Sequence, residues 1–270
     1  MKRRYRFVRP PSTQTMGRII MKWGGGLISD KSTRCKPYLD RIEKLSTCVK
    51  KLIDMGHEII IVHGAGSFGH ILAREHRLAD GNVSGIDQKN AIIQVRKDMD
   101  ILNGFVIDSL QDLSPISHAP RNFVLNSGPE FIADLNRFLD HGLHITFGDV
   151  VDCQPPMDFG ILSGDDIMFR LGVELPDVTH VIFALGGTPG LMTSHGDDGV
   201  LIPQCNPSMK FDGHHFPDID VTGGIFLKVE RALEISKSVE QVWFVDGTKT
   251  ERIIDIVENG FGIGTKFTGI

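Results

Sequence analysis

The sequence has few of the features that mark secreted, metal-binding or membrane proteins. Its 270 residues include four cysteines, which are widely spaced and form no CxxC pair and no Cys/His ligand spacing. Neither a disulfide framework nor a zinc site is indicated, and a reducing cytosol fits these thiols best. No apolar run approaches the roughly 18 to 20 residues that a membrane-spanning helix needs. We therefore expect a cytoplasmic protein without a membrane partner.

The chain also lacks the charge pattern of a nucleic-acid-binding protein. Its formal net charge is -5, and no long run of like charge occurs in the body of the chain. No basic patch for nucleic acid or for an acidic membrane is indicated, so small-molecule partners are favoured. His214 and His215 are adjacent, but adjacent side chains point apart and no third ligand is evident, so we expect no metal site formed by the protein.

Residues 1–17 differ from the rest of the chain. They are basic, contain no acidic residue and carry two prolines. This composition fits an organellar transit segment, a disordered arm, or upstream translation before a true start at Met16. We expect a flexible amino-terminal extension.

Short apolar runs alternate with longer segments of helical period, the pattern of parallel strands joined by crossover helices. The sequence therefore predicts an α/β fold, with one domain of two lobes over residues 18–270. Strands are expected at residues 18–23, 57–63, 144–151, 179–185 and 241–245. Helices are expected at residues 38–55, 86–110, 129–142, 222–237 and 250–259. Residues 151–162 should form a β-hairpin whose turn contains Pro155 and Pro156.

Three glycine clusters follow predicted strands. They are Gly24–Gly26, Gly64–Gly69 and Gly186–Gly190. Glycine lets backbone N–H groups approach an anion, and a helix that starts just afterwards adds partial positive charge. In open α/β sheets such loops gather at the carboxyl ends of the strands, where ligands bind. Glycine is also common at any strand-to-helix turn. Three clusters in this position nevertheless favour a phosphate-binding role.

The clusters match neither of the two common nucleotide motifs convincingly. GxxxxGK[ST] does not occur, and "GAGSFG" matches GxGxxG without the acidic residue that should follow a second strand. Lysines point to a different chemistry. Lys22 lies inside the first strand, Lys31 follows shortly after it, and Lys228 lies one turn into a helix. Ammonium groups are compact charges for phosphoryl oxygens, so lysines beside glycine loops indicate phosphoryl transfer.

Five short stretches of the sequence resemble those of a known group of proteins. "KWGGGLISDK", "VHGAGSFGH", "GD" at Gly148 and Asp149, "ILSGDDI" and "DVTGGIFLKVE" occur in this order over residues 18–238. Together they resemble the amino acid kinase superfamily, and within it they look most like isopentenyl phosphate kinases. The ending "GIGTKF" is similar as well. The resemblance implies an αβα sandwich with a mainly parallel central sheet, whose amino-terminal lobe binds the acceptor and whose carboxyl-terminal lobe binds the nucleotide. Homodimers are usual in such families.

The resemblance also implies a role for each matching residue. Lys22 with Gly24, Gly25 and Gly26 would contact the phosphates of ATP, and Lys31 and Lys228 would stabilise the phosphoryl group in transfer. His70 would hydrogen-bond the acceptor phosphate, with Ala65, Gly69 and Gly164 lining its pocket. Gly66, Gly186, Gly187 and Gly223 would lie on the donor side, and Mg²⁺ would bridge the donor phosphates. Asp166, or alternatively Asp165, would orient the lysines from a helix N-terminus, where simple capping is the other explanation.

The chain departs from the family pattern in one loop. Where family members usually carry "TDVDG", this sequence has "ALGGTPGLM", with no carboxylate between Ala184 and Ser194. Nucleotide binding there must use Gly186, Gly187, Thr188 or backbone groups.

The expected activity is ATP-dependent phosphorylation of isopentenyl phosphate for isoprenoid synthesis. Two alternatives remain open: a kinase of the same fold that acts on another small phosphate or phosphonate such as fosfomycin, and a nucleotide-binding regulator without turnover. His63 is as well explained as a structural hydrogen-bonding residue as by a role in the site.

Overall fold

The computed structural model describes residues 16–193, 199–209 and 224–269 of the chain. In this part of the chain, a central sheet has eight strands in the order β3-β4-β2-β1-β7-β9-β10-β8. Its strands pair in parallel except that β10 runs antiparallel to β9. The strands are β1 (Arg18–Trp23), β2 (Glu58–His63), β3 (Ile116–His118), β4 (His144–Phe147), β7 (Val178–Leu185), β8 (Gln204–Cys205), β9 (Gln241–Asp246) and β10 (Thr265–Phe267).

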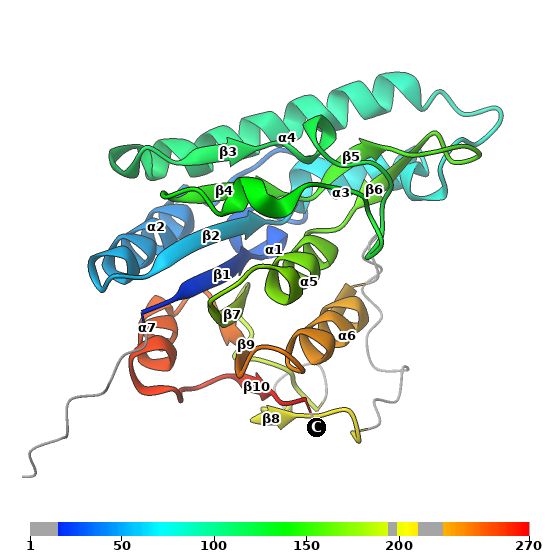
Figure 1. Ribbon diagram of the computed structural model, residues 1–270. Helices are drawn as coiled ribbons and strands as arrows, with labels where there is room; N and C mark the ends of the chain where they lie inside the picture. The colour runs from blue at the N-terminus through cyan, green and yellow to red at the C-terminus, as the bar shows by residue number, and fades with distance from the viewer. Residues whose placement is uncertain (1–15, 194–198, 210–223, 270) are drawn as a thin grey trace, which may run out of the picture.

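Helices cover both faces of this sheet (Figure 1). They are α1 (Gly25–Ile28), α2 (Leu39–Asp54), α3 (Gly66–Glu75), α4 (Lys89–Ser109), α5 (Gly164–Glu174), α6 (Gly224–Ile235) and α7 (Thr250–Asn259). Short 3₁₀ turns occur at Leu78–Asp80, Gln111–Leu113, Pro120–Asn122 and Leu135–Phe138.

Alternate side chains of β1 supply two separate cores. Ile19 and Met21 join the core under α2, α3, α4 and α7, whereas Ile20 joins the core under α5 and α6. This alternation is the period of a strand whose two faces are both covered. The predicted αβα sandwich with a mainly parallel sheet is therefore confirmed.

The predicted strand over residues 144–151 is divided in two. Gly148 donates its backbone N–H to the carbonyl of His63 at 3.2 Å, and the chain then leaves the main sheet. Residues after Gly148 form β5 (Asp149–Asp152), which pairs antiparallel with β6 (Phe159–Leu162). The predicted hairpin around Pro155 and Pro156 is confirmed.

The predicted helix over residues 129–142 is wrong. Only the turn at Leu135–Phe138 is helical among these residues. The backbone of Ile132 exchanges both hydrogen bonds with Leu125, at 2.8 and 2.9 Å, so it cannot serve a helix. Phe131, Leu135 and Phe138 still reach the core, which explains their helix-like spacing. The prediction for residues 1–17 falls almost entirely on residues 1–15, which lie outside the described residues.

Candidate active site

Two of the three glycine clusters follow the neighbouring strands β1 and β2, and the third follows β7. Since β1 pairs in parallel with both β2 and β7, all three loops leave the sheet at the same edge. Backbone hydrogen bonds join them there: Gly24 N–H donates to the carbonyl of Ala184 at 3.0 Å, and Gly64 N–H donates to that of Trp23 at 2.9 Å. The arrangement expected from the sequence is present.

These glycines are also required by the contact between the loops. A Cβ on Gly25 would lie 2.7 Å from the Cα of Gly66, and one on Gly186 would lie 2.7 Å from the carbonyl oxygen of Gly26. Gly66 has a φ of +49°, and a Cβ there would collide with the Oγ of Ser29. Close packing of the loops therefore explains part of the glycine pattern.

Ser29 fixes two of the loops to each other, a role that the sequence reasoning missed. Its hydroxyl donates to the carbonyl of Gly25 at 2.9 Å and accepts from the backbone N–H of Ser67 at 3.0 Å. Ser29 is fully buried. The only signal in the sequence was its position just after the glycine triplet.

Lys22 is a buried cation at the carboxyl end of β1. Its Nζ lies 2.6 Å from Oδ1 of Asp165, and both side chains are almost inaccessible to solvent. Asp165 stands in the first turn of α5, where Ser163 caps the helix by accepting from its backbone N–H at 3.1 Å. A Cβ on Gly164 would lie 3.3 Å from Cε of Lys22, so the lysine passes over this glycine.

Lys228 reaches the same carboxylate from α6. Its Nζ lies 3.3 Å from Oδ2 of Asp165. Burial opposes ionisation of Asp165, but the charges of Lys22 and Lys228 outweigh it and hold the pKa of this carboxyl below its usual value. The three side chains carry two positive charges and one negative charge. They form an electropositive centre that suits an anion.

Of the two carboxylates expected from the sequence to orient the lysines, Asp165 is the one with described contacts to both. Asp166 accepts from Nε of Arg231 on α6 at 2.7 Å. Burial raises the pKa of Asp166, although Arg231 opposes this shift. Consecutive residues of a helix point about 100° apart, so Asp165 reaches the lysines of β1 and α6, whereas Asp166 reaches Arg231, which lies further along α6.

The other predicted residues belong to the glycine loops and to the segments that follow them. Lys31 is exposed after α1, and a Cβ on Gly26 would lie 2.6 Å from its Cε, so its side chain crosses the first glycine loop. His70 is half-buried in the second turn of α3. A Cβ on Gly69 would lie 2.7 Å from that of Ala65 and 3.5 Å from Sδ of Met99 on α4.

A carboxylate from another strand contacts the loop after β7, which the sequence reasoning did not find. Asp246, at the end of the neighbouring strand β9, accepts from the backbone N–H of Gly187 at 3.2 Å and from the Thr248 hydroxyl at 2.7 Å. Asp246 is buried, and its hydrogen bond to Gly187 holds the loop after β7 against the end of β9. Gly186 is at the loop contact described above, whereas Gly223 lies outside the described residues.

His63 acts as a structural residue in this arrangement. It is fully buried, its Nε2 lies 3.3 Å from Oδ1 of Asn103, and its ring stacks on Phe147 with centroids 4.9 Å apart. Burial lowers the pKa of His63 to about 4, so it is neutral at pH 7. Asp149 is held in a similar structural way, by Arg121 at 2.8 Å, and Arg121 also contacts Asp100 on α4.

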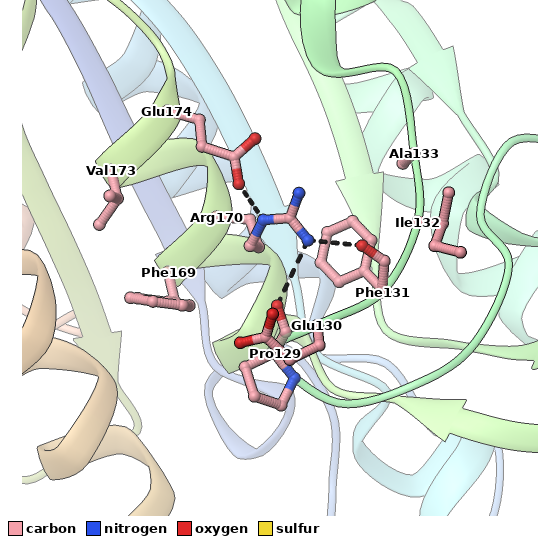
Figure 2. A pocket seen from close by; sticks show the side chains of 9 residues that line it. All are labelled: Pro129, Glu130, Phe131, Ile132, Ala133, Phe169, Arg170, Val173 and Glu174. Carbon is pink, nitrogen blue, oxygen red and sulfur yellow. Dashed lines mark hydrogen bonds and ion pairs between the residues drawn. The ribbon is translucent and has the colours of Figure 1, made fainter.

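A shallow pocket of about 450 Å³ lies along the outer side of α5, against residues 129–133. Figure 2 shows Arg170 at its centre, hydrogen-bonded to the carbonyls of Pro129 and Phe131 and paired with Glu174. The Nη1 bonds to the two carbonyls fasten the 129–133 segment to α5, and the Nε bond to Glu174 holds the guanidinium on the helix. None of the predicted site residues lines this pocket, so we do not assign the activity to it.

The part of the chain that the structure describes has neither a cluster of metal-binding side chains nor a membrane-spanning helix. No group of three or more His, Cys, Asp or Glu side chains there could hold a metal ion. No helix in that part of the chain is long and apolar enough to cross a bilayer.

The sequence of residues 17–246 matches the model of the amino acid kinase family. The chain belongs to this family. It is 33% identical over 252 residues to isopentenyl phosphate kinase of Thermoplasma acidophilum, covering 92% of this chain and 98% of that protein. It is 28% identical to isopentenyl phosphate kinase of Methanocaldococcus jannaschii, covering 87% and 92% of the two chains.

Solved structures show the same relationship. The T. acidophilum isopentenyl phosphate kinase in its product complex superposes with a TM-score of 0.75 at 27% identity, covering 94% of this chain and all of that chain. The match therefore spans both halves of the sheet that meet at the lysine centre.

Proposed function

We propose that this protein transfers the γ-phosphoryl group of ATP to isopentenyl phosphate, which gives isopentenyl diphosphate and ADP for isoprenoid synthesis. The observation that carries the proposal is the pair of lysines, Lys22 and Lys228, which share the buried Asp165 where the glycine loops meet. The similarity to isopentenyl phosphate kinases over nearly the whole chain supports the choice of acceptor.

The reaction needs position and charge rather than a covalent intermediate. An oxygen of the acceptor phosphate attacks the γ-phosphorus, and the bond from this phosphorus to the β–γ bridging oxygen breaks. Two anions must approach each other, so neutralisation of their charge lowers the barrier. Lys22 and Lys228 supply that charge, and Asp165 holds the two ammonium groups next to each other before the substrates bind. Lys31 would supply a further cation from the first glycine loop.

ATP enters as its magnesium complex, so the metal ion arrives with the substrate. In such complexes the ion bridges the donor phosphates and draws charge from them. Its remaining ligands in this site would be water and the phosphates themselves, in keeping with the acid-poor loop after β7.

In this proposal the acceptor binds on the α3 side of the lysine centre. His70 would hydrogen-bond its phosphate, with Ala65, Gly69 and Gly164 beside it. The hydrocarbon tail would then point toward α4, where Val95 and Met99 are buried against Gly69. Ile92 and Phe105 of α4 are half-buried, whereas Ile93 is 57% exposed and so faces away from this tail.

In this proposal the nucleotide binds on the β7–β9 side, against Gly186 and Gly187. Gly223, which lies outside the described residues, would also contact it. In this division the first half of residues 18–270 binds the acceptor and the second half binds the donor. The same proposal includes a homodimer and a cytoplasmic location. The cytoplasmic location rests on the four cysteine thiols, which are all free.

An ADP-release assay tests the proposal. MgATP is supplied with isopentenyl phosphate, dimethylallyl phosphate, fosfomycin or N-acetylglutamate, and the purified protein should turn over isopentenyl phosphate fastest. Preference for fosfomycin would replace the acceptor but keep the kinase. Release of ADP with none of the four, despite binding of MgATP, would replace the kinase with a nucleotide-binding regulator.

A further inference from the structure

A second ion pair lies directly beside the contact that holds Lys228. Nε of Arg231 on α6 donates to Oδ1 of Asp166 on α5 at 2.7 Å, and the two side chains are 10% and 6% exposed. The guanidinium also lies 5.5 Å from the ring centre of Phe169 on α5. One arginine therefore contacts α5 through both a carboxylate and an aromatic ring.

The spacing of these residues links the two ion pairs. Lys228 and Arg231 are three residues apart and share one face of α6. Their partners, Asp165 and Asp166, are consecutive in the first turn of α5. The two helices lie side by side (Figure 1). One turn further along α6, Ile235 packs over the opposite end of α5. A Cβ on Gly172 of α5 would lie 3.0 Å from its Cγ2.

The Lys228–Asp165 and Arg231–Asp166 ion pairs have different roles in the proposed reaction. Lys228 must direct its ammonium group at the transferring phosphoryl group, so its contact with Asp165 weakens when the donor binds. Arg231 makes the shorter contact, and it is not required to change its partner. A helix fastened only through Lys228 would shift whenever that lysine turned to the substrate.

We propose that Arg231 and Asp166 form a positioning pair that fixes α6 against α5 and so holds Nζ of Lys228 where the phosphoryl group is transferred. This inference rests on the proposed function. Arginine suits the task because its planar guanidinium is always charged and can bond a carboxylate while lying against a ring. A lysine at the same place would keep the charge but lose the planar geometry.

A double-mutant cycle tests whether Arg231 acts through Lys228. Arg231→Met should lower kcat about tenfold to a hundredfold, because a small misplacement of a group at the reacting centre has effects of this size. The KM for isopentenyl phosphate should stay within about twofold. If Arg231 acts only by placing Lys228, then Arg231→Met in a Lys228→Ala background should cause no further loss.

Conservative variants keep the test informative if Arg231→Met folds poorly. Asp166→Asn keeps an oxygen that accepts from Nε of Arg231, and Arg231→Lys keeps the charge. Both should lose less kcat than Arg231→Met. The matched control is Arg18→Met, because Arg18 is equally buried and pairs with Glu58 at the opposite end of β1. Arg18→Met should lower stability and leave kcat unchanged.

Additive losses in the Lys228→Ala background would overturn the inference, as would equal kcat values for Arg231→Met and Arg18→Met. Failure of the proposed function is a separate result, in which the unmodified protein releases no ADP with isopentenyl phosphate. In that case the crystal structure of Arg231→Met decides. We expect Nζ of Lys228 to have moved away from Asp165, and an unmoved Lys228 would contradict the positioning role.

Discussion

Strand β1 buries a cation near each of its ends, and the two are neutralised differently. Arg18, at the amino end, donates to the Glu58 carboxylate at 2.6 Å and to the carbonyl of Pro176 at 2.6 Å. One cation there has one carboxylate of its own. Lys22, at the carboxyl end, shares Asp165 with Lys228. Both cations are buried to the same degree, so burial alone does not distinguish a structural site from a functional one.

The difference lies in the ratio of charges. At the amino end a buried cation has its own carboxylate, which stabilises one conformation of the fold, whereas the described contacts at the carboxyl end put two cations on one carboxylate, an excess of positive charge. Such an excess costs stability in the free protein and becomes favourable when an anion binds. The excess occurs where backbone N–H groups of three glycine loops also gather.

The largest expected effect comes from removing the charge at the carboxyl end. Lys22→Met should lower kcat/KM about a hundredfold to a thousandfold, the usual cost of losing one preorganised charge contact to a transition state. Its stability should stay close to that of the unmodified protein, because Lys228 still pairs with Asp165. ADP-release kinetics and thermal melts would measure both.

Arg18→Met should give the opposite result to Lys22→Met, a loss of stability without a loss of activity. It should lower the free energy of unfolding by about 1–3 kcal/mol, since two charge-assisted hydrogen bonds are lost, and leave kcat unchanged. If both variants lost activity equally, the distinction between the two ends of β1 would be wrong.

The second prediction concerns the shared carboxylate. Asp165→Asn leaves the buried Lys22 and the partly buried Lys228 without their common anion and should destabilise the free protein by about 3 kcal/mol. MgATP phosphates should replace part of the lost charge. MgATP should therefore raise the melting temperature of Asp165→Asn more than that of the unmodified protein, as read by thermal melts with and without nucleotide. An equal or smaller rise would show that the phosphates bind elsewhere.

The third prediction concerns the acceptor side. His70→Ala should lower kcat/KM for isopentenyl phosphate about tenfold to a hundredfold, because it removes a hydrogen bond to a charged phosphate. Circular dichroism should show an intact fold. His76→Ala, at the end of the same helix, is the matched control and should retain full activity. Unchanged turnover in His70→Ala would remove His70 from the site.

The smallest effect should come from pH. The folded-state pKa of His63 is about 4, against an ordinary value of 6.5, because burial disfavours the charged ring. The neutral ring therefore contributes stability that is complete above pH 6.5 and is lost as the pH falls toward 4. Between about pH 7 and pH 5 this amounts to about 2 kcal/mol. Urea unfolding of His63→Gln should show a shallower pH dependence, and an unchanged slope would contradict the burial argument.

The sequence predicted five strands of the central sheet (β1, β2, β4, β7 and β9) but not the short β3, β8 and β10, and it singled out Lys22, because long buried strands and a charge within one leave local signals. Buried parallel strands are continuous apolar runs, and a charge inside such a run, as at Lys22, is conspicuous. It could not distinguish Asp165 from Asp166, because the choice depends on how α5 is rotated between β1 and α6. The helix expected at 129–142 failed for a related reason: Ile132 satisfies its backbone by pairing with Leu125 in another part of the chain.

The roles of Ser29, Asp246 and Arg231 could not be predicted either, because they depend on contacts between segments that are distant in the sequence. Each acts on a loop or helix far away in sequence, through a hydroxyl, a carboxylate or a guanidinium that is common on protein surfaces. Only the sheet order that places β7 between β1 and β9 brings Asp246 to Gly187.

A crystal structure with a non-hydrolysable ATP analogue and isopentenyl phosphate tests the central claim most directly. We expect the terminal phosphate of the analogue between Lys22 and Lys228, and the acceptor phosphate next to it on the α3 side, within hydrogen-bond distance of His70. Phosphates bound away from both lysines, for instance beside Arg170, would contradict the account.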